Sequence, residues 1–328
     1  MMLRLPDKWI WDFWLAQDGA DYHVFYLQAP RSLGDPDLRH WNVSIGHAVS
    51  QDLRDWRVLP DALRPGSSGD WDDYTTWTGS IIQHEGLWYL FYTGGNRAER
   101  GLVQRIGLAT SADLIHWEKH PANPLVVANP RWYELLDLDL WHDQAWRDPW
   151  VFRHPETGSF HALITARANH GPADGRGVVG HACSDDLINW EVMPPLTEAG
   201  EFGHLEVPQL TYIRGRYYLL FCAAASVHST ARRRRTGLEP VTGTHYLIAD
   251  DPLGPFHYST DEFLISDEIG SLYAGKLARG PGGDWVFVAS RMFAPDGTFI
   301  GALSDPLPAR IADDGNLSVA WSAEISDD

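Results

Sequence analysis

One phrase recurs five times along the chain. Its clearest copies are strand-like runs that lead into a Ser/Asp turn and end on an aromatic residue, and they lie at residues 46–56, 107–117 and 180–190. Looser copies lie at residues 247–256 and 300–307. Ser and Asp side chains favour tight turns, and such turns between β-rich segments connect strands. The phrase therefore indicates a strand-turn-strand unit that the fold repeats.

Each copy follows a β-rich segment, and a further apolar segment precedes that one. With the strand after the closing aromatic residue, each unit holds four strands, and the units recur every 55 to 75 residues, roughly. Four-stranded sheets repeated around an axis are typical of β-propellers. We predict an all-β fold, a five-bladed β-propeller with four antiparallel strands per blade, in which residues 1–328 form a single domain. Pairing of the N-terminal segment with the last blade would close the ring. Two β-sandwich domains are the alternative, but they would not repeat one phrase.

Acidic residues lie near the start of the first strand in three units. They are Asp12 in the first, Asp148 in the third and Glu206 in the fourth, and Thr78 and Tyr273 hold this place in the other two. First strands line the central axis of a propeller, so the three carboxylates are expected to converge at one mouth of the axis. Any one of them could instead accept a hydrogen bond in a turn at the end of a strand. Three such acids among Trp, Phe and Pro favour a function, because carboxylates in an apolar setting are costly.

Three converging carboxylates suit the cleavage of a glycosidic bond. One must be ionised to attack or to activate water, and one must be protonated to donate to the leaving oxygen. A third can stabilise the positive charge that develops on the sugar. Arg147 is expected to keep the neighbouring Asp148 ionised, and nearby anions are expected to raise the pKa of the acid. The catalytic candidates are Asp12, Asp148 and Glu206.

Composition limits the partners. The formal net charge of −18 argues against nucleic acid and anionic membranes, and no apolar run approaches the length that spans a bilayer. The 16 Trp residues would suit stacking on sugars, although strand-rich folds also place Trp in their cores. The first six residues lack the apolar core of a signal peptide, so we expect a cytoplasmic protein.

Other polar clusters do not indicate a cofactor or a metal. No spacing of His, Cys and Asp matches a zinc site, and Cys183 and Cys222 are expected to be free thiols. The acidic turn Asp70–Asp73 is expected to be solvated, with calcium binding as the alternative. Residues 232–235 are four consecutive arginines. Because they repel one another and have no apolar partner nearby, we expect the loop 226–242 to be mobile or bound to a second subunit of a homo-oligomer. A basic rim that binds an anionic sugar is a further alternative.

Three elements resemble known motifs. Trp-Asp-Phe-Trp at residues 11–14 resembles the nucleophile motif of glycoside hydrolase family 68, the levansucrases and related fructosyltransferases. Trp-Thr-Gly-Ser at residues 77–80 resembles the Trp-Ser-Gly-Ser element that this family shares with family 32, the invertases and fructanases. Arg-Asp-Pro at residues 147–149 matches a motif of both families. The resemblance covers the chain as a five-bladed propeller.

This resemblance implies a carbohydrate substrate, a β-fructofuranoside such as sucrose or a fructo-oligosaccharide, cleaved by a retaining double displacement. Transfer of the fructosyl group to another sugar is compatible with it. It implies that Asp12 is the nucleophile, Asp148 the transition-state stabiliser and Glu206 the general acid/base. It also implies that the fructosyl group is bound by Arg147, Trp11, Trp77 and Ser80.

Two departures leave other enzymes open. Family 32 usually has Asn-Asp-Pro-Asn around the nucleophile and often Glu-Cys around the acid, whereas this chain has Trp-Asp-Phe-Trp and Glu206-Val207-Pro208. Glu-x-Pro also resembles family 43, the arabinanases and xylosidases, which share the fold and invert. The alternatives are an inverting arabinofuranosidase or xylosidase and, from another class, a non-catalytic carbohydrate-binding propeller. The apolar surround of Asp12 favours retention, because it leaves little room for a water beneath the sugar.

Overall fold

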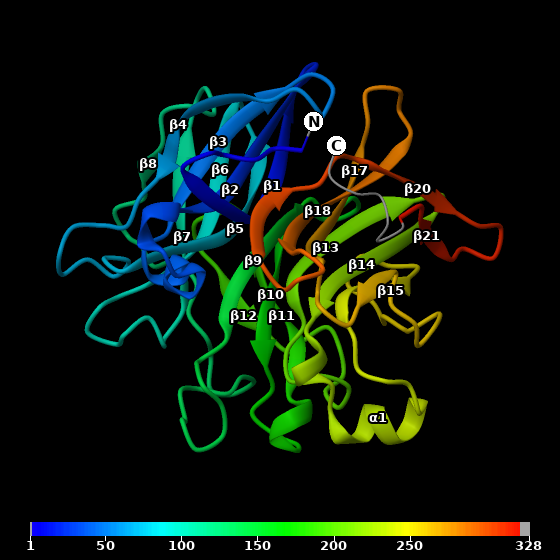
Figure 1. The fold of residues 1–328 in the computed structure, drawn as a ribbon. Helices are drawn as coiled ribbons and strands as arrows, with labels where there is room; N and C mark the ends of the chain where they lie inside the picture. The colour runs from blue at the N-terminus through cyan, green and yellow to red at the C-terminus, as the bar shows by residue number, and fades with distance from the viewer. Residues whose placement is uncertain (1, 322–328) are drawn as a thin grey trace.

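Five antiparallel sheets surround a common axis in the computed structural model, which describes residues 2–321 (Figure 1). The first strand of each sheet contacts the first strand of its neighbours, so these strands form the wall of the axis. This arrangement confirms the five-bladed propeller. Met1 and residues 322–328, which the expected domain 1–328 includes, lie outside the described residues.

The first four blades each contain four strands that follow chain order from the axis outward. Blade one contains β1 (Lys8–Asp18), β2 (Asp21–Pro30), β3 (Ser44–Ser50) and β4 (Arg57–Leu63). Blade two contains β5 (Thr75–His84), β6 (Leu87–Gly95), β7 (Arg105–Ser111) and β8 (Glu118–Lys119). Blade three contains β9 (Trp146–Arg153), β10 (Phe160–Arg167), β11 (Gly177–Ser184) and β12 (Glu191–Met193). Blade four contains β13 (Glu206–Ile213), β14 (Arg216–Ala223), β15 (Thr242–Ala249) and β16 (Ile265–Asp267).

Blade five departs from this pattern and closes the ring. Its order is β17 (Leu272–Arg279), β18 (Trp285–Phe293), β20 (Leu307–Ile311) and β21 (Leu317–Val319), and β19 (Phe299–Leu303) also pairs with β18. The Leu303 backbone N–H donates to the Leu3 carbonyl at 3.0 Å. The N-terminal segment therefore pairs with the last blade, as expected for closure of the ring.

The repeated phrase is the connection between the third and fourth strands of a blade. In blades one to three its Asp carboxylate accepts two backbone N–H bonds from the turn, at Asp52, Asp113 and Asp186. The leucine after each Asp is buried and has a positive φ of 61–65°. A short polar cap and a buried leucine thus fix each turn, which explains why the phrase recurs.

A β-bulge interrupts every first strand near its start. In β9, β13 and β17 the bulged residue has a positive φ, which is 57° at Asp148, 52° at Val207 and 51° at Ala274. A bulge re-aims side chains, so that two consecutive residues can face the same side of the sheet. The bulged positions are Asp12, Thr78, Asp148, Val207 and Ala274, and the residues before them are Trp11, Trp77, Arg147, Glu206 and Tyr273.

This register corrects one expectation about the acids. Asp12 and Asp148 occupy the bulged position, but Glu206 precedes it and is therefore equivalent to Arg147. The sequence pattern could not resolve this offset, because a bulge adds a residue without changing the residue types around it. Glu206 still faces the axis because both bulge-flanking side chains do.

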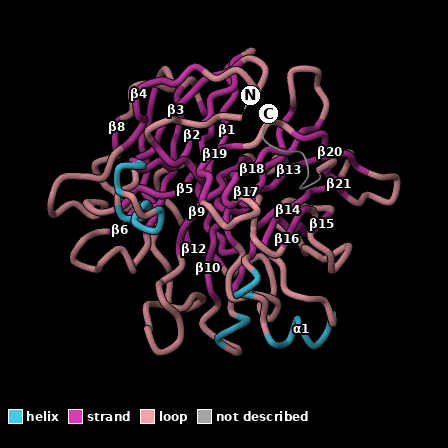
Figure 2. Tube along the Cα trace, in the orientation of Figure 1, coloured by secondary structure: helices cyan, strands magenta, loops and turns pink. Residues whose placement is uncertain are grey.

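The connections after the second strands carry the short helices (Figure 2). They are η1 (Arg31–Leu33), η2 (Pro36–Trp41), η3 (Ala173–Gly175), η4 (Ala225–Val227) and α1 (Thr230–Thr236). No helix within residues 2–321 has the length and apolar character needed to cross a bilayer.

The arginine loop is better anchored than its sequence predicts. The Ser229 side chain caps α1 by accepting from the Arg232 N–H. Arg232 is only 2% exposed, since its guanidinium binds Glu201 at 2.9 Å and lies over the Phe202 ring. Arg235 also binds Glu201, at 2.7 Å. The expectation that the arginines have no apolar partner is therefore wrong for Arg232, because the fold brings the Phe202 ring to it from about thirty residues away. Binding of this loop to a second subunit remains a prediction.

Candidate active site

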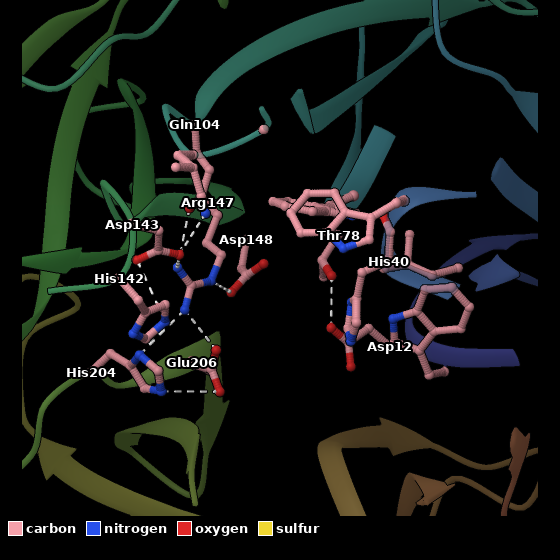
Figure 3. Close-up of a pocket in the computed structure, with 16 residues that line it drawn as sticks. Asp12, His40, Thr78, Gln104, His142, Asp143, Arg147, Asp148, His204 and Glu206 are labelled. Carbon is pink, nitrogen blue, oxygen red and sulfur yellow. Dashed lines mark hydrogen bonds and ion pairs between the residues drawn. The ribbon is translucent and has the colours of Figure 1, made fainter. Parts of the chain in front are cut away.

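A cavity of about 320 Å³ lies at the mouth of the axis where the first strands begin (Figure 3). Four blades supply its wall through their bulged positions and the residues that precede them, namely Trp11, Asp12, Trp77, Thr78, Arg147, Asp148 and Glu206. The loops at the same mouth add His40, Trp41, Gln104, His142, Asp143 and His204. The three catalytic candidates thus line one cavity, although 136 residues separate Asp12 from Asp148 and 58 separate Asp148 from Glu206.

Asp12 projects from β1 and faces the other two acids across the cavity (Figure 3). The Thr78 hydroxyl donates to its Oδ2 at 2.9 Å. Burial raises the pKa of Asp12, while this hydrogen bond and the charges of Lys276 and Arg39 act in the opposite direction. Its apolar surroundings are Trp11 and the fully buried Phe13.

Asp148 is held rigidly at the bulge of β9. Its Oδ2 accepts from the Thr165 hydroxyl at 2.8 Å and from the Val207 N–H at 3.3 Å. Burial raises the pKa of Asp148 to about 7, although the Arg147 guanidinium acts to lower it. Arg147 thus acts on Asp148 in the expected direction, but burial outweighs it, because the nearest Arg147 nitrogen lies 3.6 Å away and its terminal nitrogens bind other groups.

Glu206 forms the ion pair with the Arg147 guanidinium. Arg147 Nη2 donates to its Oε1 at 2.7 Å, and the Tyr273 hydroxyl donates to its Oε2 at 2.5 Å. The His204 Nε2 lies 3.4 Å from the same Oε2. Burial acts to raise the pKa of Glu206, but His204, Arg147 and Tyr273 together outweigh it and lower the pKa to about 2. The pKa of Glu206 is thus lowered and not raised, because these neighbours outweigh burial.

Asp143 is a further carboxylate in this cavity that the sequence did not single out. Its Oδ2 accepts from Arg147 Nη1 at 3.1 Å and from Gln104 Nε2 at 2.8 Å. Arg147 therefore bridges the loop before β9 to Glu206. Asp143 precedes the strand instead of lying in it, so it has no equivalent in the repeat that would have marked it.

Three of the four expected substrate-binding residues line the cavity, namely Trp11, Trp77 and Arg147. The Trp77 indole is fixed by donation of its N–H to the His40 carbonyl at 2.9 Å. Ser80 does not line the cavity. It is buried between blades, where its hydroxyl accepts from the Val151 N–H at 2.9 Å. Ser80 thus fastens blade two to blade three, and Thr78 occupies the place at the cavity that was expected for it.

The side chains of the described residues form no cluster that could hold a metal ion. No group of three or more His, Cys, Asp or Glu side chains among residues 2–321 is arranged to hold an ion. In the acidic turn, Asp70 accepts from the Ser67 N–H, Asp72 binds Lys119, and Asp73 accepts from the Gly69 N–H. Cys183 and Cys222 are free thiols.

Solved structures share this fold over nearly the whole chain. Inulosucrase from Halalkalicoccus jeotgali, solved with kestose, superposes with a TM-score of 0.76 over 96% of this chain and 87% of its own, at 20% identity. The Bombyx mori family 32 β-fructofuranosidase gives a TM-score of 0.68 over 97% of this chain and 64% of its own, at 20% identity. A thermostable family 43 hydrolase gives 0.67 over 100% and 98%, at 14% identity. At these identities the likeness establishes the fold alone.

Sequence comparison is more specific. The sucrose:sucrose 1-fructosyltransferase of Festuca arundinacea is 35% identical over 194 residues, which are 56% of this chain and 26% of that protein. The sucrose-6-phosphate hydrolase of Bacillus subtilis is 30% identical over 209 residues, 61% and 38% respectively. The chain thus matches less than half the length of these relatives. The family model of the glycosyl hydrolases family 32 N-terminal domain matches residues 13–288. The chain therefore belongs to glycosyl hydrolase family 32.

Proposed function

We propose that this protein hydrolyses β-fructofuranosides, such as sucrose or fructo-oligosaccharides, by a retaining double displacement. The observation that carries the proposal is the meeting of Asp12, Asp148 and Glu206 from three blades in one indole-walled cavity. Family membership supports a fructosyl substrate, since the printed names of two relatives are those of a sucrose fructosyltransferase and a sucrose-6-phosphate hydrolase.

In the first step, the Asp12 carboxylate attacks the anomeric carbon as the bond to the leaving oxygen breaks, and Glu206 donates its proton to that oxygen. Asp148 faces the developing positive charge and stabilises it. In the second step, Glu206 removes a proton from water, the resulting hydroxide attacks the anomeric carbon, and Asp12 is released. An acceptor sugar hydroxyl that replaced the water would give transfructosylation.

The proton on Glu206 must come with substrate binding. Arg147 and Tyr273 both donate to this carboxylate and favour its ionised form. Sugar hydroxyls can accept the Arg147 hydrogen bonds in place of Glu206. Loss of that ion pair raises the pKa of Glu206. This change places a proton where the first step of the double displacement needs it.

The anomer released first tests the mechanism. A retaining enzyme gives β-fructofuranose from sucrose, which proton NMR or polarimetry detects before mutarotation. Release of the inverted anomer would reject the double displacement and favour the alternative of a family 43 type. That alternative shares the fold, and this measurement separates the two by the stereochemistry of their products.

A substrate panel tests the sugar. Sucrose, inulin, levan and nitrophenyl pentosides are compared, and the released sugar is identified. Fructose release supports the proposal, release of arabinose or xylose supports the pentosidase, and binding without turnover supports a carbohydrate-binding propeller. Transfructosylation, a cytoplasmic location and a homo-oligomer remain predictions.

A further inference from the structure

Four leucines are exposed within six consecutive residues at the mouth of the propeller. Residues 135–140, here called the leucine loop, read Leu-Leu-Asp-Leu-Asp-Leu and lie between β8 and β9. The leucines are 42%, 37%, 55% and 39% exposed, in chain order. Contiguous exposed apolar side chains on a globular protein mark an interaction site far more often than scattered ones do.

The leucine loop is held in place from both ends. On one side, the Glu134 carboxylate binds Arg167 at 2.7 Å and Arg176 at 2.5 Å. On the other, the Trp141 ring packs under the Arg167 guanidinium, 3.8 Å from its centroid. Within the loop, the Leu140 and Trp141 N–H groups both donate to the Asp137 carbonyl. The leucines are therefore presented on an ordered segment, and docking would cost little conformational entropy.

The chemistry of the loop selects its occupant. Asp137 and Asp139 alternate with the leucines and are exposed, and with a net charge of −18 they disfavour an anionic membrane. Aliphatic side chains also lack the flat faces on which sugars stack. The loop therefore calls for a protein surface that combines apolar contacts with positive charge.

The chain itself carries such a surface on α1. Arg233 and Arg234 are exposed there, whereas Arg232 and Arg235 are engaged by Glu201 and Asp261. Leu238, which follows the helix, is 44% exposed. Two arginines on α1 and the leucine that follows it complement two aspartates and the leucines of the loop, in a protein that is otherwise strongly acidic.

Both surfaces lie at the same mouth of the propeller. The leucine loop connects a fourth strand to the next first strand, and α1 connects a second strand to a third, so strand direction places both at the start of the first strands. Figure 1 shows both segments projecting from the same side of the ring, with α1 labelled. A twofold axis can therefore set the loop of each copy on α1 of the other, as an isologous interface requires.

We propose that the protein forms a twofold dimer in which the leucine loop of each copy docks on Arg233, Arg234 and Leu238 of its partner. His142 and Asp143 follow the loop directly and line the cavity. The interface would therefore border the entrance to the active site. The proposal depends on the surface alone and is independent of the reaction that the cavity performs.

The first test measures the mass of the full chain by sedimentation equilibrium and by light scattering after size-exclusion chromatography. The wild type is expected to be a dimer at micromolar concentration. Leu138→Asp should raise the dimer dissociation constant at least ~10-fold, because it places a charge where the proposed interface buries a leucine. Val58→Asp, at a 51% exposed position on β4, is the matched control and should leave the dimer intact. A monomeric wild type, or a dimer that Leu138→Asp does not weaken, would overturn the proposal.

A charge-reversal experiment tests the pairing itself. The double variant Asp137→Arg with Asp139→Arg should be monomeric, and so should Arg233→Glu with Arg234→Glu. Mixed together, the two variants should form a heterodimer, since each loop then meets a helix of opposite charge. All four positions are exposed, so circular dichroism should show intact folding. Failure of the mixture to associate, with both variants folded, would reject contact between loop and helix.

Discussion

Removal of the Tyr273 hydroxyl tests which carboxylate supplies the proton. Tyr273→Phe keeps the ring and deletes the donor that lies 2.5 Å from Glu206 Oε2. That hydrogen bond favours the ionised carboxylate and contributes to the lowered pKa of Glu206. Its loss must therefore raise the pKa of Glu206.

The size of the shift follows from the energy of the bond. A hydrogen bond to a charged group contributes about 1.5–3 kcal/mol. At 1.36 kcal/mol for each unit of pKa, the pKa of Glu206 should rise by about 1–2 units. If Glu206 is the general acid, activity requires its protonated form. The alkaline limb of the pH dependence should then move to higher pH by the same amount.

The assay is the pH dependence of kcat at saturating sucrose, which reports pKa values in the enzyme–substrate complex, in the wild type and in Tyr273→Phe. Asp148 has a pKa of about 7 and receives no hydrogen bond from Tyr273. An alkaline limb that stays in place would therefore refute the assignment of Glu206 and point to Asp148. The matched control is Tyr92→Phe, which removes a hydroxyl bound to Asp72 at 2.8 Å and outside the cavity. It should leave the pH profile unchanged.

Three further predictions use simpler measurements. Asp12→Asn and Glu206→Gln should fold but lose about 10²–10⁴-fold in kcat for sucrose. For Glu206→Gln, the loss in kcat should be smaller with a nitrophenyl fructoside, because its leaving group needs no proton. Wild-type turnover by either folded variant would contradict its role. Ser80→Ala should leave KM for sucrose unchanged but lower the free energy of unfolding in urea by about 1–2 kcal/mol, because the buried Val151 N–H loses its acceptor; a raised KM with full stability would restore Ser80 to the sugar pocket. Burial lowers the pKa of His47 to about 3 and of His181 to about 4, so both are neutral when folded, whereas the unfolded chain binds protons below about pH 6.5. Stability should therefore be constant above that pH and fall as the pH drops towards 4, and a Tm that is flat from pH 7.5 to 4.5 would contradict this.

The fold could be predicted because its signals are local. The Asp carboxylates at 52, 113 and 186 bind N–H groups two and three residues ahead, so each turn is encoded within a few residues. Each repeated turn marks one blade, so the number of blades and their order along the chain follow from the repeats. The same logic predicts that Asp12, Asp148 and Glu206 meet at one mouth, since each lies near the start of a first strand.

The ion pairs of the site could not be predicted from the sequence. Arg147 is adjacent to Asp148 in the chain, yet it makes its shortest contact with Glu206, 59 residues away. The bulge of β9 aims both side chains into the cavity, and Asp143 and Gln104, from two different connections, then orient the guanidinium. Adjacency therefore predicted the wrong ion pair.

The same distinction separates Ser80 and Arg232 from their expected roles. Ser80 belongs to a motif, but the bulge at Thr78 leaves it between two blades. Arg232 looked solvated because Glu201 and Phe202 come from another connection. Turns can be predicted from the sequence, because hydrogen bonds over two or three residues hold them. Charge states and interaction partners follow from the folded chain, because they depend on burial and on distances of about 3 Å between distant segments.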